Sequence, residues 1–360
     1  MPTINQELSP VTSTNHSSEI KSTLPIQPFF FGRIEELRQI YDTLRPEYRS
    51  WGVMIAGPGG IGKTALAIQA AEQAPEELFE QKIFISAKIR ELTPAGEVCL
   101  TDFVQPTFFG MLTELMKNVK NDGIVPDFNI NIASDLRSLL MSKKILIIFD
   151  NLETLEFSER ERLYQFLSRL PAHNKAIVTC RRLSIGFGVK IIPLGYLSYD
   201  DSMKILLEYK KTHHRLQKVK MEELLELCKI TNGNPCLINW IAGQFGNENS
   251  SCYTLDDAYK LLKKNPENDP MEYVFGDLMD NMTDKELAIL DALGWFETPA
   301  EIKWISEMTQ ISVSDLDLIL YDLKKRSIVI SEAEMTLFTL PILAKSYMKQ
   351  KGAQNRKGDK

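Results

Sequence analysis

The stretch WGVMIAGPGGIGKT at residues 51–64 decides the fold of this chain of 360 residues. Its apolar part, residues 53–56, is typical of a buried strand, and four glycines follow at positions 57, 59, 60 and 62. Lys63 and Thr64 then open a segment, ALAIQAAEQA, that favours a helix. Strand, glycine-rich loop and Lys-Thr at a helix start match the pattern G-x-x-x-x-G-K-[ST] in the context that this motif requires.

The chemistry of phosphate binding explains this pattern of residues. A loop that merely turns the chain into a helix would not need it. A triphosphate needs many hydrogen-bond donors in a small concave space, and backbone N–H groups supply them where side chains are absent. The helix that begins near Gly62 adds unpaired N–H groups and the positive end of its dipole. In this motif Lys63 reaches the β- and γ-phosphates and the Thr64 hydroxyl holds Mg²⁺. The sequence therefore predicts a nucleotide site.

Length and composition indicate a globular protein of two or three domains. Hydrophobic residues make up 44% and charged residues 25% of the chain, as is usual for a soluble protein. The net charge of −6 does not suggest a nucleic-acid binder. The five cysteines form no C-x-x-C pair, so we expect reduced thiols and a cytoplasmic location. The sequence has no apolar run of transmembrane length and no stretch typical of the h-region of a signal peptide.

A second motif, KKILIIFD at residues 143–150, predicts a strand that is buried on both faces and ends in Asp150. Ligands of open α/β sheets bind at the carboxyl ends of the strands. Beside the loop at residues 57–64, Asp150 is therefore expected to support Mg²⁺ together with Thr64. Asp150 could instead cap the turn that follows it.

Three further residues could act on the terminal phosphate. Asn151 stands where many P-loop ATPases have a second acid, and it cannot act as a general base. Glu153 could polarise the attacking water or be an exposed residue at a helix start. A strand predicted at residues 175–180 leads into Arg181, which could contact the γ-phosphate or lie on the surface.

The rest of the chain predicts a helical domain and a winged helix. Helices alone are expected from residue 198 to 264, whereas residues 271–348 read helix, helix, helix, strand, turn, strand, helix. Residues 271–350 hold seven Lys and Arg against fourteen Asp and Glu, which disfavours phosphate contacts and favours a structural or regulatory lid. The predicted segments are a disordered lead-in (1–27), a P-loop nucleotide-binding domain (28–195), a helical domain (196–265), a winged-helix domain (271–350) and a disordered tail (351–360).

Five motifs in order resemble NB-ARC domains of the STAND class of signal-transduction ATPases. They are FGRIEEL at 31–37, GPGGIGKT at 57–64, ILIIFDNLE at 145–153, IVTCR at 177–181 and GNPCL at 233–237. The resemblance covers roughly residues 29–347. It implies an AAA+-like (ASCE) α/β P-loop domain with a parallel sheet, followed by an all-α helical domain and a winged-helix domain.

The resemblance also implies roles for individual residues. Arg33 and the backbone near Phe31 would lie along the base and ribose, Arg181 would sense the γ-phosphate, and Pro235 would pack on the nucleotide and report its state. The predicted catalytic residues are Lys63, Asp150, Glu153 and Arg181, and the predicted metal-binding residues are Thr64 and Asp150. The predicted binding residues for ATP or ADP are Phe31, Gly32, Arg33, Gly57, Pro58, Gly59, Gly60, Ile61, Gly62, Lys63, Thr64, Ala65 and Pro235.

Two departures from the family pattern bear on function. Pro341 stands where many members have a His that contacts the ADP β-phosphate, so the contacts that hold the ADP state are weaker or built differently. The given sequence shows no effector domain before Phe29 and no repeat sensor after Lys360, so we expect either a module of a longer protein or a chain that works with separately encoded partners.

The resemblance implies a switch in signalling or defence that is closed with ADP, opens and self-associates with ATP, and hydrolyses ATP slowly. Two alternatives stay open. One is an AAA+-like ATPase that remodels or loads DNA-bound complexes, although nucleic acid is not an expected partner of so acidic a winged helix. The other is a scaffold that binds nucleotide without hydrolysis, which Asn151 favours. No membrane association is expected.

Overall fold

The computed structural model describes most of the chain, and predictions for residues 1–20 lie outside the described part. The described residues are 21–88, 90–93, 96–99, 107–120, 131–181, 188–246, 250–264, 270–271, 274–275, 279, 282–325, 328–332 and 336–358. Among them, no helix has both the length and the apolar character needed to cross a bilayer.

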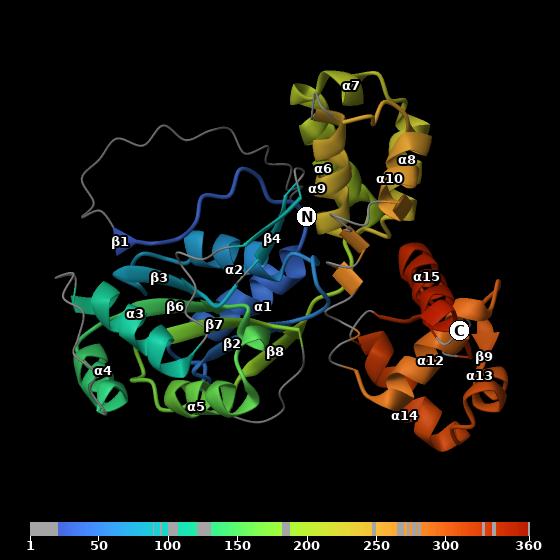
Figure 1. Cartoon of the computed structure of the whole chain (residues 1–360). Helices are drawn as coiled ribbons and strands as arrows, with labels where there is room; N and C mark the ends of the chain where they lie inside the picture. The colour runs from blue at the N-terminus through green and yellow to red at the C-terminus, as the bar shows by residue number, and fades with distance from the viewer. Residues whose placement is uncertain are drawn as a thin grey trace, which may run out of the picture.

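A six-stranded parallel sheet forms the first part of the molecule, in the order β1-β3-β6-β7-β2-β8 (Figure 1). Strand β7 separates β2, which leads into the glycine-rich loop, from β6, which ends at Asp150. The carboxyl ends of β2, β7 and β6 therefore meet at one edge of the sheet. The strands are β1 (Lys21–Ser22), β2 (Gly52–Ala56), β3 (Gln81–Ser86), β6 (Ile145–Asp150), β7 (Lys175–Cys180) and β8 (Lys190–Pro193).

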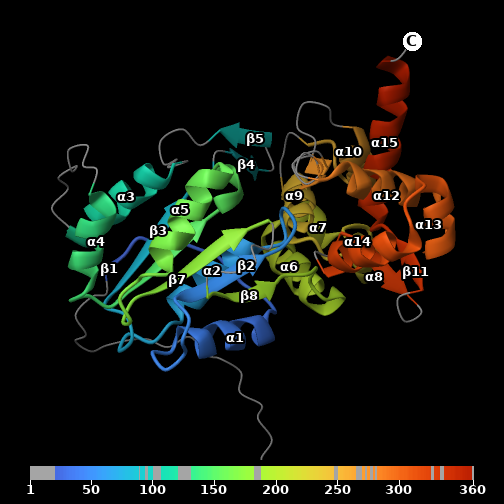
Figure 2. The ribbon, with the colours of Figure 1, turned by 90° about the horizontal axis from the view of Figure 1, so that it is seen from below.

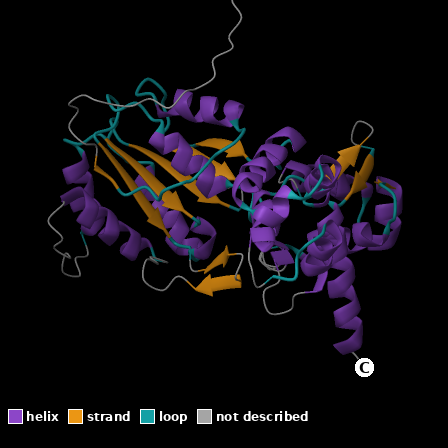
Figure 3. Ribbon diagram, turned by 90° about the horizontal axis from the view of Figure 1, so that it is seen from above, coloured by secondary structure: helices purple, strands orange, loops and turns teal. Residues whose placement is uncertain are grey.

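Helices cover both faces of this sheet (Figure 3). This arrangement explains why the sequence of β6 is apolar at nearly every position. Ile145, Ile147 and Phe149 pack in the core beneath α3, α4 and α5, whereas Leu146 and Ile148 pack beneath α1 and α2. Alternate residues of a strand point to opposite faces, so a strand between two helical layers needs apolar residues at every position. The helices are α1 (Ile34–Leu44), α2 (Lys63–Glu72), α3 (Phe108–Lys120), α4 (Ile132–Leu140) and α5 (Phe157–Leu167), with a 3₁₀ turn η1 (Leu152–Thr154).

A helical unit and a winged helix follow (Figure 2). The winged helix has a three-stranded antiparallel sheet in the order β10-β11-β9, and a capping box of Thr283 and Glu286 opens its first helix. The predicted fold class is thus confirmed. The helical unit holds α6 (Tyr199–Thr212), α7 (His214–Gln217), α8 (Met221–Ile230), α9 (Pro235–Gly246) and α10 (Leu255–Lys264). The winged helix holds α12 (Asp284–Trp295), β9 (Ala300–Glu301), α13 (Ile302–Thr309), α14 (Val313–Lys325), β10 (Ile330–Glu332), β11 (Leu337–Thr339) and α15 (Ile342–Gly358).

The structure corrects the predicted ends of the ordered chain. Lys21 and Ser22 pair in parallel with Gln81 and Lys82, so the lead-in is structured before residue 27. Helix α15 continues to Gly358, beyond the predicted start of a disordered tail at residue 351. The antiparallel hairpin of β4 (Arg90–Thr93) and β5 (Gly96–Cys99) was not predicted, because four-residue strands give too short a pattern to recognise.

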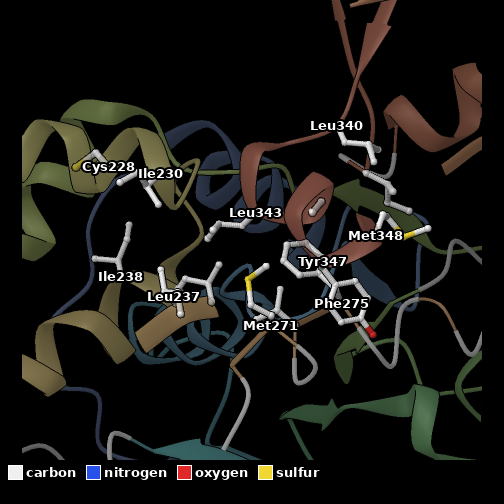
Figure 4. Packing of buried hydrophobic residues seen from close by; sticks show 14 of the residues in the cluster. Cys228, Ile230, Leu237, Ile238, Met271, Phe275, Leu340, Leu343, Tyr347 and Met348 are labelled. Carbon is white, nitrogen blue, oxygen red and sulfur yellow. The ribbon is translucent and has the colours of Figure 1, made fainter. Parts of the chain in front are cut away.

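A continuous apolar cluster joins the helical unit to the winged helix (Figure 4). Leu237 of α9, Met271, and Leu343 and Tyr347 of α15 point into this cluster. The Phe275 ring lies 5.8 Å from the Tyr347 ring, measured between centroids. Met271 and Phe275, two described residues of the connection between the two units, are both buried.

Candidate nucleotide site

The glycine-rich loop between β2 and α2 has the backbone that its glycines permit. Gly60 and Gly62 adopt φ values of +70° and +95°, in the left-handed region that other residues rarely enter. Gly62 is also the N-cap of α2, so that Lys63 and Thr64 begin the helix. The first N–H groups of α2 have no partner within the helix and are available to an anion.

Lys63 is folded back onto this loop. Its Nζ donates hydrogen bonds to the carbonyl oxygens of Gly57 and Pro58, each at 2.9 Å, and the residue is 8% exposed. Burial lowers the pKa of the Lys63 ammonium, and the nearby Glu153 carboxylate opposes this shift. A buried cation that bonds only to carbonyl oxygens favours the approach of an anion, as a phosphate would provide.

Asp150 lies at the carboxyl end of β6 and accepts three hydroxyl hydrogen bonds. Thr64 Oγ1 and Thr179 Oγ1 donate to Asp150 Oδ1 at 2.6 and 2.7 Å, and Ser86 Oγ donates to Oδ2 at 3.0 Å. Asp150 is 1% exposed, so these hydroxyls replace the water that a buried carboxylate loses. The carboxylate is therefore held beside Thr64, the residue predicted to bind the metal.

This arrangement fits Mg²⁺. In the described part of the chain, no group of three or more His, Cys, Asp or Glu side chains could form a metal site. Mg²⁺ does not need such a cage, since it keeps several waters and binds one or two protein oxygens together with substrate phosphates. Thr64 and Asp150 would hold the ion, which would neutralise phosphate charge when bound.

Glu153 is aimed into the site by an unusual backbone turn at Asn151. Asn151 has a φ of +63°, which asparagine tolerates better than most residues, and η1 begins directly after it. Glu153 in η1 then forms an ion pair with Arg181, whose Nε lies 3.0 Å from Glu153 Oε1. The side chains are 15% and 13% exposed, so the pair is largely shielded from water.

Two neighbouring cavities lie over the glycine-rich loop. The P-loop cavity, of about 350 Å³, is bounded by the loop, the ends of β3, β6 and β7, and helices α6 and α9. The aromatic cavity, of about 80 Å³, contains the run at residues 29–31. The P-loop cavity is lined by Gly59, Gly60, Ile61, Gly62, Lys63, Thr64, Ala65, Lys88, Asn151, Glu153, Thr179, Arg181, Tyr209, Pro235, Cys236, Asn239 and Trp240.

The FGR motif borders the aromatic cavity. Phe31 and Arg33 line this cavity, whereas Gly32 packs against Asp201 of α6. Arg33 Nη2 donates to the carbonyl oxygens of Gly195 at 2.6 Å and Ile61 at 3.3 Å. Burial lowers the pKa of this guanidinium. Arg33 therefore ties the glycine-rich loop to the connection that leads into the helical unit.

The turn before α9 is docked on the glycine-rich loop. The Cys236 N–H donates to the Gly60 carbonyl oxygen at 3.1 Å, and Asn234 Nδ2 donates to that of Gly59 at 3.4 Å. Asn234 Oδ1 also accepts the N–H groups of Cys236 and Leu237, which caps α9. One asparagine thus fixes both the start of α9 and its contact with the loop.

The structure brings most of the predicted site residues together. Gly57 and Pro58 do not line either cavity but supply the carbonyl oxygens that bind Lys63. Pro341 lies elsewhere: it is buried at the start of α15, where its carbonyl oxygen accepts the Lys345 N–H. Sequence reasoning missed the cavity residues Lys88, Tyr209, Cys236, Asn239 and Trp240, and the Asp150 partner Ser86.

Comparison with known proteins identifies a domain family and a fold. Residues 30–178 match the AAA ATPase domain family, and no curated protein matches the chain by sequence. The chain is similar to the ORC2 protein of Aeropyrum pernix, with a TM-score of 0.55, 12% identity, and coverage of 91% of this chain and 98% of that one. It is also similar to a Walker-type ATPase of Pyrococcus abyssi, with a TM-score of 0.53, 13% identity, and coverage of 89% and 96%.

A STAND protein with a tetratricopeptide repeat sensor from Pyrococcus horikoshii also matches, with a TM-score of 0.43 and 18% identity. That match covers 92% of this chain, which spans 44% of the length of the STAND protein. At these identities, the likeness to ORC2 and to the Walker-type ATPase shows the fold alone. The family match therefore identifies residues 30–178 as an AAA-type nucleotide-binding ATPase domain.

Proposed function

We propose that the chain is a nucleotide-operated switch of the STAND type. ADP with Mg²⁺ holds the P-loop domain, helical unit and winged helix in a closed arrangement. Exchange for ATP releases the winged helix, and the opened protomers associate with one another. Slow hydrolysis of ATP returns the chain to the closed state. A separately encoded sensor or effector is a further possible partner.

The observation that carries this proposal is the contact between α9 and the glycine-rich loop. Cys236 N–H bonds to Gly60, and Pro235, Cys236 and Asn239 of α9 line the same cavity as Lys63. The helical unit therefore touches both the loop that would bind phosphate and the space that the nucleotide would fill. A nucleotide can shift the balance between the closed and the open arrangement only if it makes different contacts in the two. The contacts of α9 with the loop and the cavity provide such a difference.

A second contact continues from the loop to the winged helix. A side chain at Gly59 would meet the Val274 carbonyl oxygen at 3.1 Å, so Val274, in the connection between the two units, lies directly against the loop. Its next residue, Phe275, packs on Tyr347 of α15. A movement of the loop that displaces Val274 would thus loosen the apolar cluster of Figure 4.

Slow hydrolysis follows from the Arg181–Glu153 ion pair. In this pair Arg181 holds the Oε1 atom of the Glu153 carboxylate, whereas Oε2 has no hydrogen-bond partner among the described residues. A terminal phosphate would compete for the guanidinium, because Arg binds phosphate as readily as carboxylate. Glu153 would then be released to accept the proton of the attacking water. ATP in the site would thus free the catalytic base from its ion pair, which suits a switch.

We expect Glu153→Gln to lower ATP turnover by about 100-fold or more, because loss of a general base typically has this effect. ADP affinity should stay within about 3-fold, since Glu153 repels phosphate rather than binding it. Phosphate release under single-turnover conditions measures the first quantity and titration calorimetry the second. The exposed Glu156→Gln is the matched control. Turnover that is measurable and unchanged in Glu153→Gln would remove Glu153 as the base and favour a different source of hydrolysis.

Replacement of Gly60 tests whether the contact between α9 and the glycine-rich loop holds the nucleotide in the closed state. In Gly60→Ala the new Cβ would lie 2.5 Å from Cys236 Cβ, so α9 or the loop must move. Overpacking of this kind costs about 1–3 kcal/mol. We expect the dissociation rate of a fluorescent ADP analogue to rise about 10-fold, in line with that cost.

Gly188→Ala is the matched control, because Gly188 has a φ of +65° but no neighbour within 4 Å of the new Cβ. The two variants share the backbone strain of a left-handed residue, and only Gly60→Ala disturbs α9. Equal ADP dissociation rates in both variants would contradict a closed state held by the contact between α9 and the loop.

The winged helix supports a role other than DNA binding. Helix α14 carries Asp315, Asp317 and Asp322, and its exposed apolar residues are Val313, Leu318 and Tyr321. Carboxylates repel a phosphate backbone, whereas exposed apolar side chains suit contacts with protein. We therefore propose protein rather than nucleic acid as the partner of this unit.

A further inference from the structure

Asn239 occupies a distinctive place at the candidate site. The P-loop cavity and the aromatic cavity share a boundary formed by Ile61, Gly62, Ala65, Pro235 and Asn239. Of these five, only Asn239 has a polar side chain. It is exposed on α9, and its carboxamide makes no hydrogen bond to any residue that the structure describes.

The two cavities differ in the chemistry that they offer a ligand. The P-loop cavity contains Lys63 and Thr64, which suit phosphate and its metal ion. The aromatic cavity contains the rings of Phe29, Phe30 and Phe31, which suit a planar base. In a nucleotide the sugar joins the base to the phosphates. The boundary between the cavities is therefore where the sugar would lie.

We infer that the Asn239 carboxamide binds the ribose hydroxyls and selects ribonucleotides over deoxyribonucleotides. A carboxamide presents a donor and an acceptor, and each ribose hydroxyl is also both. The apolar and glycine residues at the boundary offer no side-chain hydrogen bond in its place. The inference rests on the proposed nucleotide site and adds a specificity determinant to it.

Because Asn239 lies on α9, the same contact would link the sugar to the helical unit. Pro235, one helical turn earlier, lies 3.8 Å from the position of a Cβ on Gly62, measured from its Cγ. Pro235 would thus pack on the ligand while Asn239 supplies a directed hydrogen bond. This places a ribose contact and an apolar contact on one face of α9.

The test compares the affinities of the full chain for ADP, 2′-deoxy-ADP and 3′-deoxy-ADP by calorimetry, in the wild type and in Asn239→Leu. The leucine side chain is similar in size but has no polar atom. We expect the wild type to prefer ADP over at least one deoxy analogue by about 3- to 10-fold, the range for one neutral hydrogen bond. Asn239→Leu should lower the affinity for ADP to that for this analogue, and it should leave the affinity for the analogue unchanged.

Three other outcomes would each decide a different point. Equal wild-type affinity for all three nucleotides would overturn the inference and leave the proposed switch intact. A preference for ADP that persists in Asn239→Leu would assign ribose recognition to another residue. Absence of ADP binding by the wild type would overturn the proposed function and the inference together.

Discussion

Lys63→Met should weaken the binding of ADP and of ATP by about 100-fold or more, corresponding to roughly 3 kcal/mol for a lost charge-assisted contact. Lys63 is buried beneath the P-loop cavity, and among the residues that the structure describes it bonds only to the carbonyl oxygens of Gly57 and Pro58. Its charge is thus compensated weakly without nucleotide and strongly by phosphate. Equilibrium titration with a fluorescent ADP analogue measures the change.

Lys82→Met is the matched control for this variant. Lys82 is also buried, at 5% exposed, and its Nζ donates to the carbonyl oxygens of Glu72 and Ala74. Burial lowers the pKa of both ammonium groups. The two substitutions remove the same kind of interaction, but Lys82 does not border the cavities over the loop. If both variants lowered the affinity for ADP equally, the loss would come from general destabilisation of the fold and not from a lost contact with phosphate.

Asp150→Asn should abolish the effect of Mg²⁺ on ATP binding and lower ATP turnover by about 100-fold or more, because the metal supplies several kcal/mol of charge stabilisation. The amide has the shape of the carboxylate, and its oxygen can still accept the Thr64 and Thr179 hydroxyls. It lacks the charge that supports a divalent cation. Titration of nucleotide with Mg²⁺ and with a chelator compares the two conditions.

Asp150→Ala separates the metal from the fold. This change leaves the hydroxyls of Ser86, Thr64 and Thr179 without their shared acceptor. Each unsatisfied buried group costs about 1–3 kcal/mol, so the free energy of unfolding should fall by about 3 kcal/mol or more relative to wild type. In Asp150→Asn the free energy of unfolding should fall much less. Persistence of a full Mg²⁺ effect in Asp150→Asn would show that the metal is held by other groups.

Much of the nucleotide-binding domain could be predicted because its signals are local. The glycine spacing at residues 57–62 reflects a backbone with positive φ at Gly60 and Gly62, and the apolar run ending in Asp150 reflects a strand between two helical layers. Strand β7 was predicted with its observed bounds, Lys175–Cys180. In these stretches each residue type is required by its immediate surroundings.

The wall of the cavity on the helical side could not be found in this way. Tyr209, Asn239 and Trp240 reach the site only because α6 and α9 fold back over the glycine-rich loop. Within their own helices they resemble any other polar or aromatic residue. The GNPCL motif predicted Pro235 but not the hydrogen bond from Cys236 to Gly60, which depends on long-range packing.

The Arg181–Glu153 pair could be predicted in part: the two residues were identified from the sequence, but their contact was not. Each residue was a candidate for the γ-phosphate on its own, because each follows a strand of the sheet. Their ion pair at 3.0 Å depends on the turn at Asn151, which was considered only as a missing acid. The left-handed backbone at Asn151 gives that residue a structural role that its chemistry alone did not suggest.

The most direct test of the switch is the nucleotide content of the purified chain. Protein freed of excess nucleotide by gel filtration is denatured, and the supernatant is separated by ion-exchange chromatography. The account predicts stoichiometric ADP in the wild type and none in Lys63→Met. A site that is empty in the wild type, combined with free exchange of ATP and rapid turnover, would contradict a switch held closed by ADP.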